Sequence, residues 1–181
     1  PSPLQISSLL LAADFYLASG TVTVDPTRRK VLIIRDRLTN TYQLPRGRKD
    51  WGEPLETTAV RETLEETGSY ATLLPVPLAT RSTAPAAATR DPTHRHHAAV
   101  RGAQFDPSGD VLLGGTARLT EPVALMQHYQ PSGALAVVLW YVAVGDSCAT
   151  LERGMQMADE DFEASWVDYS EAPGLMVNHD C

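Results

Sequence analysis

The sequence has few cysteines, no long apolar run and no excess of positive charge. Its two cysteines, Cys148 and Cys181, form no CxxC motif and are too few for a disulfide framework, so we expect a reduced, intracellular setting. The longest apolar run, residues 134–144, is too short to cross a bilayer and is typical of a buried strand. The formal net charge of −7 argues against general binding of nucleic acid, but it permits a local basic pocket.

The N-terminal region carries an apolar patch, residues 9–13, with no positive charge before it, so it does not resemble an intact signal peptide. We therefore expect a cytoplasmic protein. The chain opens on Pro1 rather than Met, which leaves open that a targeting segment has been removed. With 181 residues, of which 43% are apolar, residues 1–181 are expected to form one domain with a sizeable core.

The chain reads as strands around one strong helix. Strands are expected at residues 17–24, 30–35, 42–44, 71–79, 118–129, 134–144 and 162–167. The helix is expected to begin at Pro54, whose missing N–H would be unpaired there anyway, and to end at Gly68. Residues 45–52 are expected to be a loop, residues 81–101 a mobile surface loop, and residues 168–176 to hold a last helical turn. This order predicts the α+β class.

Three glutamates stand out on the expected helix. Glu62, Glu65 and Glu66 have the spacing i, i+3 and i+4, which places them on one helix face within about one turn. Like charges at this spacing destabilise a helix, so a cation should compensate them. Carboxylates are the ligands that hard ions such as Mg²⁺ and Mn²⁺ prefer. The plainer alternative is a solvated, glutamate-rich helix face.

The spacing of seven residues in residues 47–68 matches a known motif. These residues are Gly47, Glu53, Arg61, Glu62, Glu65, Glu66 and Gly68. In identity and spacing they resemble the Nudix box, so the chain is identified as similar to the Nudix (MutT-like) hydrolases. Thr63 and Ser69 depart from the pattern, which prefers bulky apolar residues there, and this departure concerns packing rather than ligation. Residues 47–68 are called the box segment below.

The resemblance implies a fold, a cofactor and a reaction. Similar proteins fold as an α/β/α sandwich around a mixed sheet, with the box forming a loop, a helix and a loop. They use Mg²⁺ or Mn²⁺ to hydrolyse a phosphoanhydride bond, because bound cations neutralise charge on the diphosphate and lower the pKa of the attacking water.

The resemblance also implies roles for single residues of this chain. Glu62 and Glu66 correspond to metal ligands, and Glu65 to a ligand or general base. The Gly47 carbonyl would complete the metal shell, while Glu53 and Arg61 would orient the glutamates. A further acidic ligand is expected downstream, and Glu160 is the candidate, with Asp159 and Asp161 beside it.

Basic residues around the box suggest a phosphate-rich substrate. The segment that leads into the box, residues 44–49, resembles that of Nudix members acting on diphosphoinositol polyphosphates and diadenosine polyphosphates. It supplies Arg46, Arg48 and Lys49 as candidate substrate-binding residues. A second cationic run is Arg28, Arg29 and Lys30, and a third is His94, Arg95, His96 and His97. These runs either converge on the site or form separate solvated turns.

Other functions stay open at this point. One alternative is a Nudix hydrolase of ADP-ribose, nucleotide sugars or the RNA cap, although the array SQPWxFPxS of NADH hydrolases is absent. A second alternative is a catalytically silent Nudix domain that only binds a ligand. Trp51 either stacks on a base or packs on the domain surface. The expected partner is a small phosphate-rich molecule, with no membrane and no nucleic acid except capped RNA.

Overall fold

The computed structural model describes residues 9–77, 104–105, 111–112, 118–157 and 160–176. The longer strands are β1 (Phe15–Asp25), β2 (Lys30–Asp36), β10 (Ala124–Tyr129), β11 (Leu135–Val144) and β12 (Phe162–Asp168). The shorter strands are β3 (Thr41–Gln43), β4 (Arg46–Arg48), β5 (Thr72–Leu73), β6 (Val76–Pro77), β7 (Gln104–Phe105), β8 (Val111–Leu112) and β9 (Arg118–Leu119). The helices are α1 (Leu55–Thr67) and α4 (Ala172–Met176).

The main sheet has eight strands and is mixed. Its order is β10-β11-β1-β2-β12, with β3 added to β2, β4 to β1 and β5 to β11. β1 and β11 run parallel from the Phe15–Leu135 pair to the Val24–Val144 pair, whereas the other neighbours are antiparallel. Because β4 pairs with β1, the start of the box segment is attached to the centre of the sheet.

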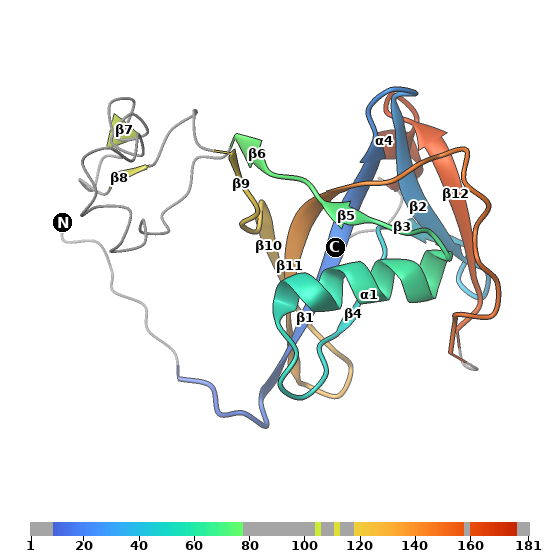
Figure 1. Ribbon diagram of the computed structural model, residues 1–181. Helices are drawn as coiled ribbons and strands as arrows, with labels where there is room; N and C mark the ends of the chain where they lie inside the picture. The colour runs from blue at the N-terminus through green and yellow to red at the C-terminus, as the bar shows by residue number, and fades with distance from the viewer. Residues whose placement is uncertain (1–8, 78–103, 106–110, 113–117, 158–159, 177–181) are drawn as a thin grey trace.

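Within the described residues, each face of the sheet carries one helix. On β1, Thr21 faces α1, since its hydroxyl lies 2.7 Å from that of Thr63. Side chains alternate along a strand, so Val22 points to the other face, where it packs with Ile33 and with Ala172 of α4. Figure 1 shows α1 running across the sheet and α4 at the end where β1 turns into β2. The α+β class expected from the sequence is confirmed, with helices on both faces.

The buried strands explain why this sheet forms. In β2 the four consecutive residues 31–34 are buried, because one face of the strand meets the α4 side and the other meets the α1 side. β11 is the longest apolar run of the sequence and pairs with β10 on one side and β1 on the other. The expected strands at 17–24, 30–35, 42–44, 134–144 and 162–167 correspond to β1, β2, β3, β11 and β12.

Three expectations differ from the structure. The loop expected at residues 45–52 contains β4, because its backbone pairs with residues 18–20 of β1. The strand expected at residues 71–79 is instead β5 and β6, which join different sheets and flank Pro75. The strand expected at residues 118–129 is split into β9 and β10 around Pro122. Proline lacks the N–H that a sheet ladder needs, which accounts for both interruptions.

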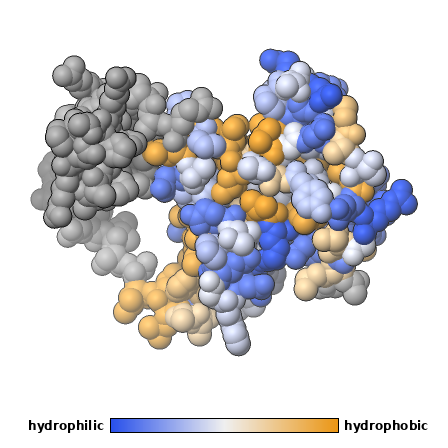
Figure 2. Space-filling view, in the orientation of Figure 1, coloured by the Kyte–Doolittle hydropathy of each residue, from blue (hydrophilic) through white to orange (hydrophobic). Residues whose placement is uncertain are grey.

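The expected surface loop at residues 81–101, including the His94–His97 run, lies wholly outside the described residues, as does Cys181. In the described part of the chain, no helix combines the length and apolar character that membrane crossing requires. Figure 2 shows hydrophilic side chains over α1, in contrast to the apolar surface of residues 9–13 at one end of the molecule.

Candidate functional site

Helix α1 carries the acidic residues of the box segment. It begins after Pro54, which is extended, and has Glu56 in its first turn, near the positive end of the helix dipole. It ends where Gly68 adopts a left-handed conformation, with φ of 70°, and donates its N–H to the Leu64 carbonyl at 2.7 Å. The expected bounds of this helix are therefore confirmed to within one residue.

Glu62, Glu65 and Glu66 lie on the sides of α1 that meet β4 and the segment before β12. Glu62 and Glu66 are buried, at 8% and 4% exposure, whereas Glu65 is partly exposed. The Glu66 Oε2 accepts the backbone N–H of Arg46 at 2.8 Å, which fastens β4 to the helix. The plainer alternative of a solvated face is wrong for Glu62 and Glu66, since their carboxylates are removed from water.

Gly47 allows β4 to approach α1. A Cβ built on this residue would lie 1.9 Å from the Glu62 Oε2, so a side chain here would displace that carboxylate. Gly20 of β1 has a similar role, because its Cβ would lie 2.3 Å from the Pro45 carbonyl. The box motif predicts a role for Gly47, whereas Gly20 belongs to no motif and its role is visible only in the structure.

Arg61 joins the acidic residues of the box segment. Its guanidinium makes a two-pronged pair with Glu53, at 2.9 Å for both Nε to Oε1 and Nη2 to Oε2. Its Nη1 donates to Glu62 and to Glu65, at 2.7 Å each, and its Nη2 also donates to the Arg48 carbonyl at 2.9 Å. The two-pronged pair that an arginine can make with a carboxylate is thus formed with Glu53.

The carboxylates of the site have opposite pKa shifts. The hydrogen bonds from Arg61 are the main cause that lowers the pKa of Glu53 to about 2. Burial is the main cause that raises the pKa of Glu62 to about 7 and that of Glu66 to about 8. The site therefore holds two carboxyl groups that are costly to ionise beside one that stays ionised.

Glu160 lies near this group. Its negative charge is among the causes that raise the pKa of both Glu62 and Glu66. Its Oε2 accepts the Met157 N–H at 3.0 Å, and its own N–H donates to the Met157 carbonyl at 3.1 Å. Of its expected neighbours, Asp161 is paired with Arg37 at 3.2 Å, and Asp159 is outside the described residues.

The chain offers oxygen ligands here, but not as a compact cluster. In the described ranges, no three His, Cys, Asp or Glu side chains are grouped closely enough to form a ready metal site. Glu62 and Glu65 both direct an oxygen to Arg61, which lies between them. A cation would therefore meet the buried carboxylates of Glu62 and Glu66 together with the oxygens that Arg61 leaves free.

The first cationic run flanks the glutamates. Arg46 is the first residue of β4. Burial raises the pKa of Glu66, whereas the positive charge of Arg46 lowers it. The Arg48 guanidinium lies over the Tyr16 ring, 4.1 Å from its centre, so one face of this cation is covered. Lys49 donates from its Nζ to the Asp50 carbonyl at 2.8 Å.

The second cationic run lies elsewhere. Arg28 pairs with Asp25, Lys30 with Asp168, and Arg29 lies over the Tyr169 ring. Asp25 is six residues along β1 from Ser19, the partner of Gly47, which is about 20 Å at the usual rise of a strand. Of the two possibilities for this run, the structure supports a separate turn rather than convergence on the box segment.

The two departures from the box pattern are accommodated by polar packing. Thr63 is fully buried, and its hydroxyl donates to the Ala59 carbonyl and contacts the Thr21 hydroxyl. Ser69 is buried, and its N–H donates to the Thr67 hydroxyl. Trp51, in contrast, is fully exposed, so it does not pack on the domain surface.

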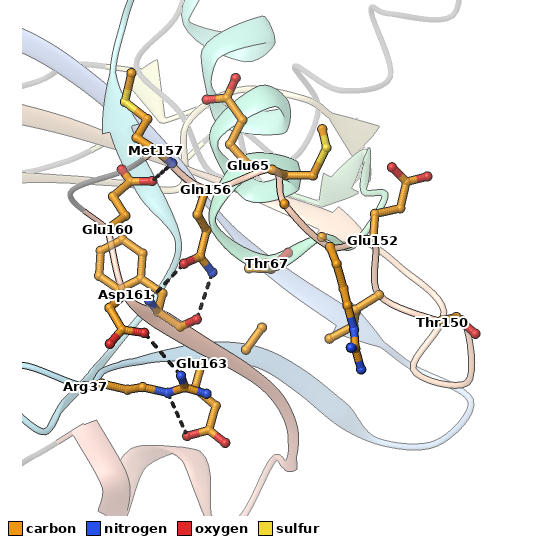
Figure 3. A pocket seen from close by; sticks show the side chains of 17 residues that line it. Arg37, Glu65, Thr67, Thr150, Glu152, Gln156, Met157, Glu160, Asp161 and Glu163 are labelled. Atoms are coloured by element: carbon orange, nitrogen blue, oxygen red, sulfur yellow. Dashed lines mark hydrogen bonds and ion pairs between the residues drawn. The ribbon is translucent and has the colours of Figure 1, made fainter.

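A groove of about 680 Å³ opens beside the glutamates (Figure 3). Glu65 and Thr67 of α1 form one side, and the segment before β12, with Gln156 and Glu160, forms another. Gln156 was not expected from the sequence, because one glutamine in a loop carries no motif. The groove is predominantly acidic, since its two arginines, Arg37 and Arg153, face a larger number of carboxylates.

Comparisons with known proteins agree with this geometry. The model of the NUDIX domain matches residues 15–114, which include the whole box segment, whereas no curated protein matches the sequence. Among solved structures, a NUDIX hydrolase from Nitrosomonas europaea is 12% identical, with a TM-score of 0.54 over 92% of this chain and 81% of that chain. A NUDIX family hydrolase from Clostridium perfringens is 15% identical, with a TM-score of 0.53 over 90% and 92% of the two chains. A C. elegans Ap4A hydrolase in a binary complex is 14% identical, with a TM-score of 0.50 over 90% and 86%. Identities this low show a shared fold.

Proposed function

Because this chain belongs to the Nudix family of pyrophosphohydrolases, we propose that its box segment binds divalent cations and hydrolyses a phosphoanhydride bond. The observation that carries this proposal is the acidic face of α1. Two of its three glutamates, Glu62 and Glu66, are buried and have raised pKa values, so their ionised forms lack sufficient compensation within the protein.

The residues present fit a hard divalent cation such as Mg²⁺ or Mn²⁺. Glu62 and Glu66 supply buried carboxylates, and the missing side chain of Gly47 leaves room for the Glu62 carboxylate against β4. Glu160 and the Gly47 carbonyl are the further proposed ligands, whereas Glu65, which the resemblance offers as a ligand or a general base, is proposed as the base. When bound, the cation would neutralise charge on the diphosphate oxygens and lower the pKa of the attacking water.

The chain's own groups then position and receive protons. Arg61 holds one oxygen each of Glu62 and Glu65, and Glu53 fixes the plane of Arg61 through the two-pronged pair. Glu65 is partly exposed at the groove and bonds Arg61 through Oε2, which leaves its Oε1 to accept a proton from water. We assign Glu65 as the general base on this ground.

For the substrate, the charges around the box segment favour diadenosine polyphosphates over diphosphoinositol polyphosphates. Of the expected cations, Arg46 contacts Glu66 through its backbone N–H, and Arg48 and Lys49 follow it in the chain, whereas Arg28 and Lys30 are already paired with Asp25 and Asp168. An inositol ring crowded with phosphates requires more cations than that, and the adjoining groove is predominantly acidic. The similar fold of an Ap4A hydrolase is compatible with this choice.

The test is turnover of a small panel with purified protein. The panel contains a diadenosine polyphosphate, a diphosphoinositol polyphosphate, ADP-ribose, NADH and capped RNA, each with Mg²⁺, Mn²⁺ or EDTA. Glu66→Gln is the matched control, because it keeps the shape of a buried side chain while removing its charge. We expect metal-dependent cleavage of the diadenosine compound, with kcat lowered at least about a hundredfold in Glu66→Gln, as for loss of a group that stabilises the transition state.

Each other result has a definite meaning. Cleavage of ADP-ribose or capped RNA alone would keep the mechanism and overturn the substrate. An unchanged rate in Glu66→Gln would overturn the assignment of the acidic face. No cleavage of any compound by the folded, metal-saturated protein would favour a binding module over an enzyme.

A further inference from the structure

Gln156 ties helix α1 to the start of β12. Its Nε2 donates one hydrogen bond to the Glu66 carbonyl at 3.0 Å and one to the Phe162 carbonyl at 2.8 Å. Its Oε1 accepts the Phe162 N–H at 3.0 Å, and two of these bonds are drawn in Figure 3. All three contacts pair a donor with an acceptor, so the orientation of this amide is unambiguous and its hydrogen-bonding groups are used.

These contacts provide hydrogen-bond donors to carbonyl groups at the end of the helix. The last four carbonyls of an α-helix lack partners within the helix, and the Glu66 carbonyl is one of them. Gln156 supplies a donor to it, and the Glu152 N–H donates to the Gly68 carbonyl at 2.8 Å. The segment between β11 and β12 is thus fastened twice to the end of α1, at residues of the box segment.

Hydrogen bonds of Gln156 and of its neighbour Met157 lie on the two sides of Glu160. Glu160 exchanges two hydrogen bonds with Met157, which directly follows Gln156. Two residues beyond Glu160, the N–H and the carbonyl of Phe162 each form a hydrogen bond with the Gln156 amide. Glu160 is therefore held on one side by Met157, the chain neighbour of Gln156, and on the other side by its short distance along the chain from Phe162, which the Gln156 amide fixes.

We propose that Gln156 is a positioning residue that holds the Glu160 segment against the carboxylate face of α1. The inference rests on the proposed function, because Gln156 acts by positioning Glu160, which is one of the proposed cation ligands. Gln156 acts by fixing one glutamate, Glu160, relative to another, Glu66, whose main chain it also holds. It need not touch the substrate.

The test substitutes Gln156→Met, which keeps the length of the side chain and removes its polar atoms. The matched control is Tyr70→Phe, which removes the 2.7 Å hydrogen bond from Tyr70 to Glu152 and so loosens the same segment away from Glu160. Binding of Mn²⁺ is measured by calorimetry without substrate, together with kcat, KM and the melting temperature. For Gln156→Met we expect the Mn²⁺ Kd to rise on the order of tenfold, as for loss of a group that orients a ligand. We also expect kcat to fall and KM to change little, whereas Tyr70→Phe should bind Mn²⁺ like the wild type.

A cycle with Glu160→Gln tests the route of the effect. If Gln156 acts through Glu160, Gln156→Met should weaken Mn²⁺ binding much less in the Glu160→Gln background than in the wild type. Three results would each overturn the inference. The first is full additivity of the two substitutions in their effect on Mn²⁺ binding. The others are an unchanged Mn²⁺ Kd in folded Gln156→Met and an equal loss of Mn²⁺ affinity in Tyr70→Phe.

Two further outcomes are also decisive. If Gln156→Met does not fold, Gln156→Asn keeps an amide one methylene shorter, and the same criteria apply to it. Failure of the wild-type protein both to bind Mn²⁺ and to hydrolyse any compound would overturn the proposed function and this inference together. Metal-dependent turnover by the wild type, with the Mn²⁺ Kd and kcat of the Gln156 variants unchanged, would overturn this inference and leave the proposed function standing.

Discussion

The most connected side chain of the site is Arg61. Its five hydrogen bonds reach three carboxylates and one main-chain carbonyl, so it uses the full donor capacity of a guanidinium. This pairing raises its own pKa further above the usual range, chiefly through Glu53. A lysine could not reproduce the two-pronged contact, which explains why an arginine stands here.

Substituting Arg61→Ala should therefore destabilise the folded chain. Glu53 and Glu62, whose side chains are about 10% exposed, would lose their cation and stay buried. We expect the free energy of unfolding in EDTA at pH 8 to fall by about 3 kcal/mol, which is the typical cost of removing one partner of a buried ion pair. Lys30→Ala, which breaks a more exposed pair with Asp168, is the control and should cost less than about 1 kcal/mol in the same urea titration. Equal losses would contradict the central role of Arg61.

At the scale of elements, the end of α1 is defined by Gly68 and its contact with the β11–β12 segment. Gly68 has positive φ, and a Cβ on it would lie 2.0 Å from the Glu152 carbonyl oxygen. Two separate reasons thus require glycine at this position: the left-handed conformation and the close backbone approach. The box pattern contains this glycine, but the pattern does not reveal the second reason.

Comparison of two glycine substitutions separates these reasons. Gly133 has φ of 86° and no atom within 4 Å of a built Cβ, so Gly133→Ala tests the conformation alone and should cost about 1 kcal/mol. Gly68→Ala adds the steric conflict with Glu152, and we expect a total above about 2 kcal/mol. Urea unfolding of both variants is the measurement. A cost for Gly68→Ala no larger than that for Gly133→Ala would show that the segment moves aside freely.

At the scale of the whole molecule, the acidic site reduces stability as the pH rises. The folded pKa values of Glu62 and Glu66, about 7 and 8, exceed the ordinary value of 4.5 because both groups are buried. Protonation then favours the folded state, so this contribution is fully present below about pH 4.5 and is lost as the pH rises through 7 and 8. Glu53, with a pKa of about 2, acts in the opposite direction and loses its contribution only as the pH falls from 4.5 toward 2.

We therefore expect the metal-free chain to lose unfolding free energy between pH 5.5 and pH 8.5. Glu66→Gln, which removes one titrating group, should show a smaller loss over this range. Addition of Mg²⁺ should stabilise the wild type more at pH 8.5 than at pH 5.5, because carboxylates must release protons to bind the cation. Urea titrations at the two pH values, with Mg²⁺ or EDTA, measure each effect. The same pH dependence in Glu66→Gln and wild type would contradict the raised pKa of Glu66.

Local sequence patterns predicted much of the fold. β2 and β11 are apolar runs whose length and β-branched content are typical of buried strands, and Pro54 and Gly68 mark the ends of α1 by their own backbone chemistry. The short strands were predicted less well. β4 reads as a loop because its pairing with β1 depends on residues 18–20, which lie far away in the sequence.

The sequence by itself determined the acidic helix face and the family, because helical spacing and seven motif positions are local properties. Only the tertiary structure decided which charged groups are buried and with which groups they are paired. It separates Arg28–Lys30 from the box segment, buries Glu62 and Glu66, and brings Gln156 from ninety residues away to the Glu66 carbonyl. The physical reason is that burial and hydrogen-bond partners depend on how strands and helices pack, and residues distant in the chain contribute to that packing.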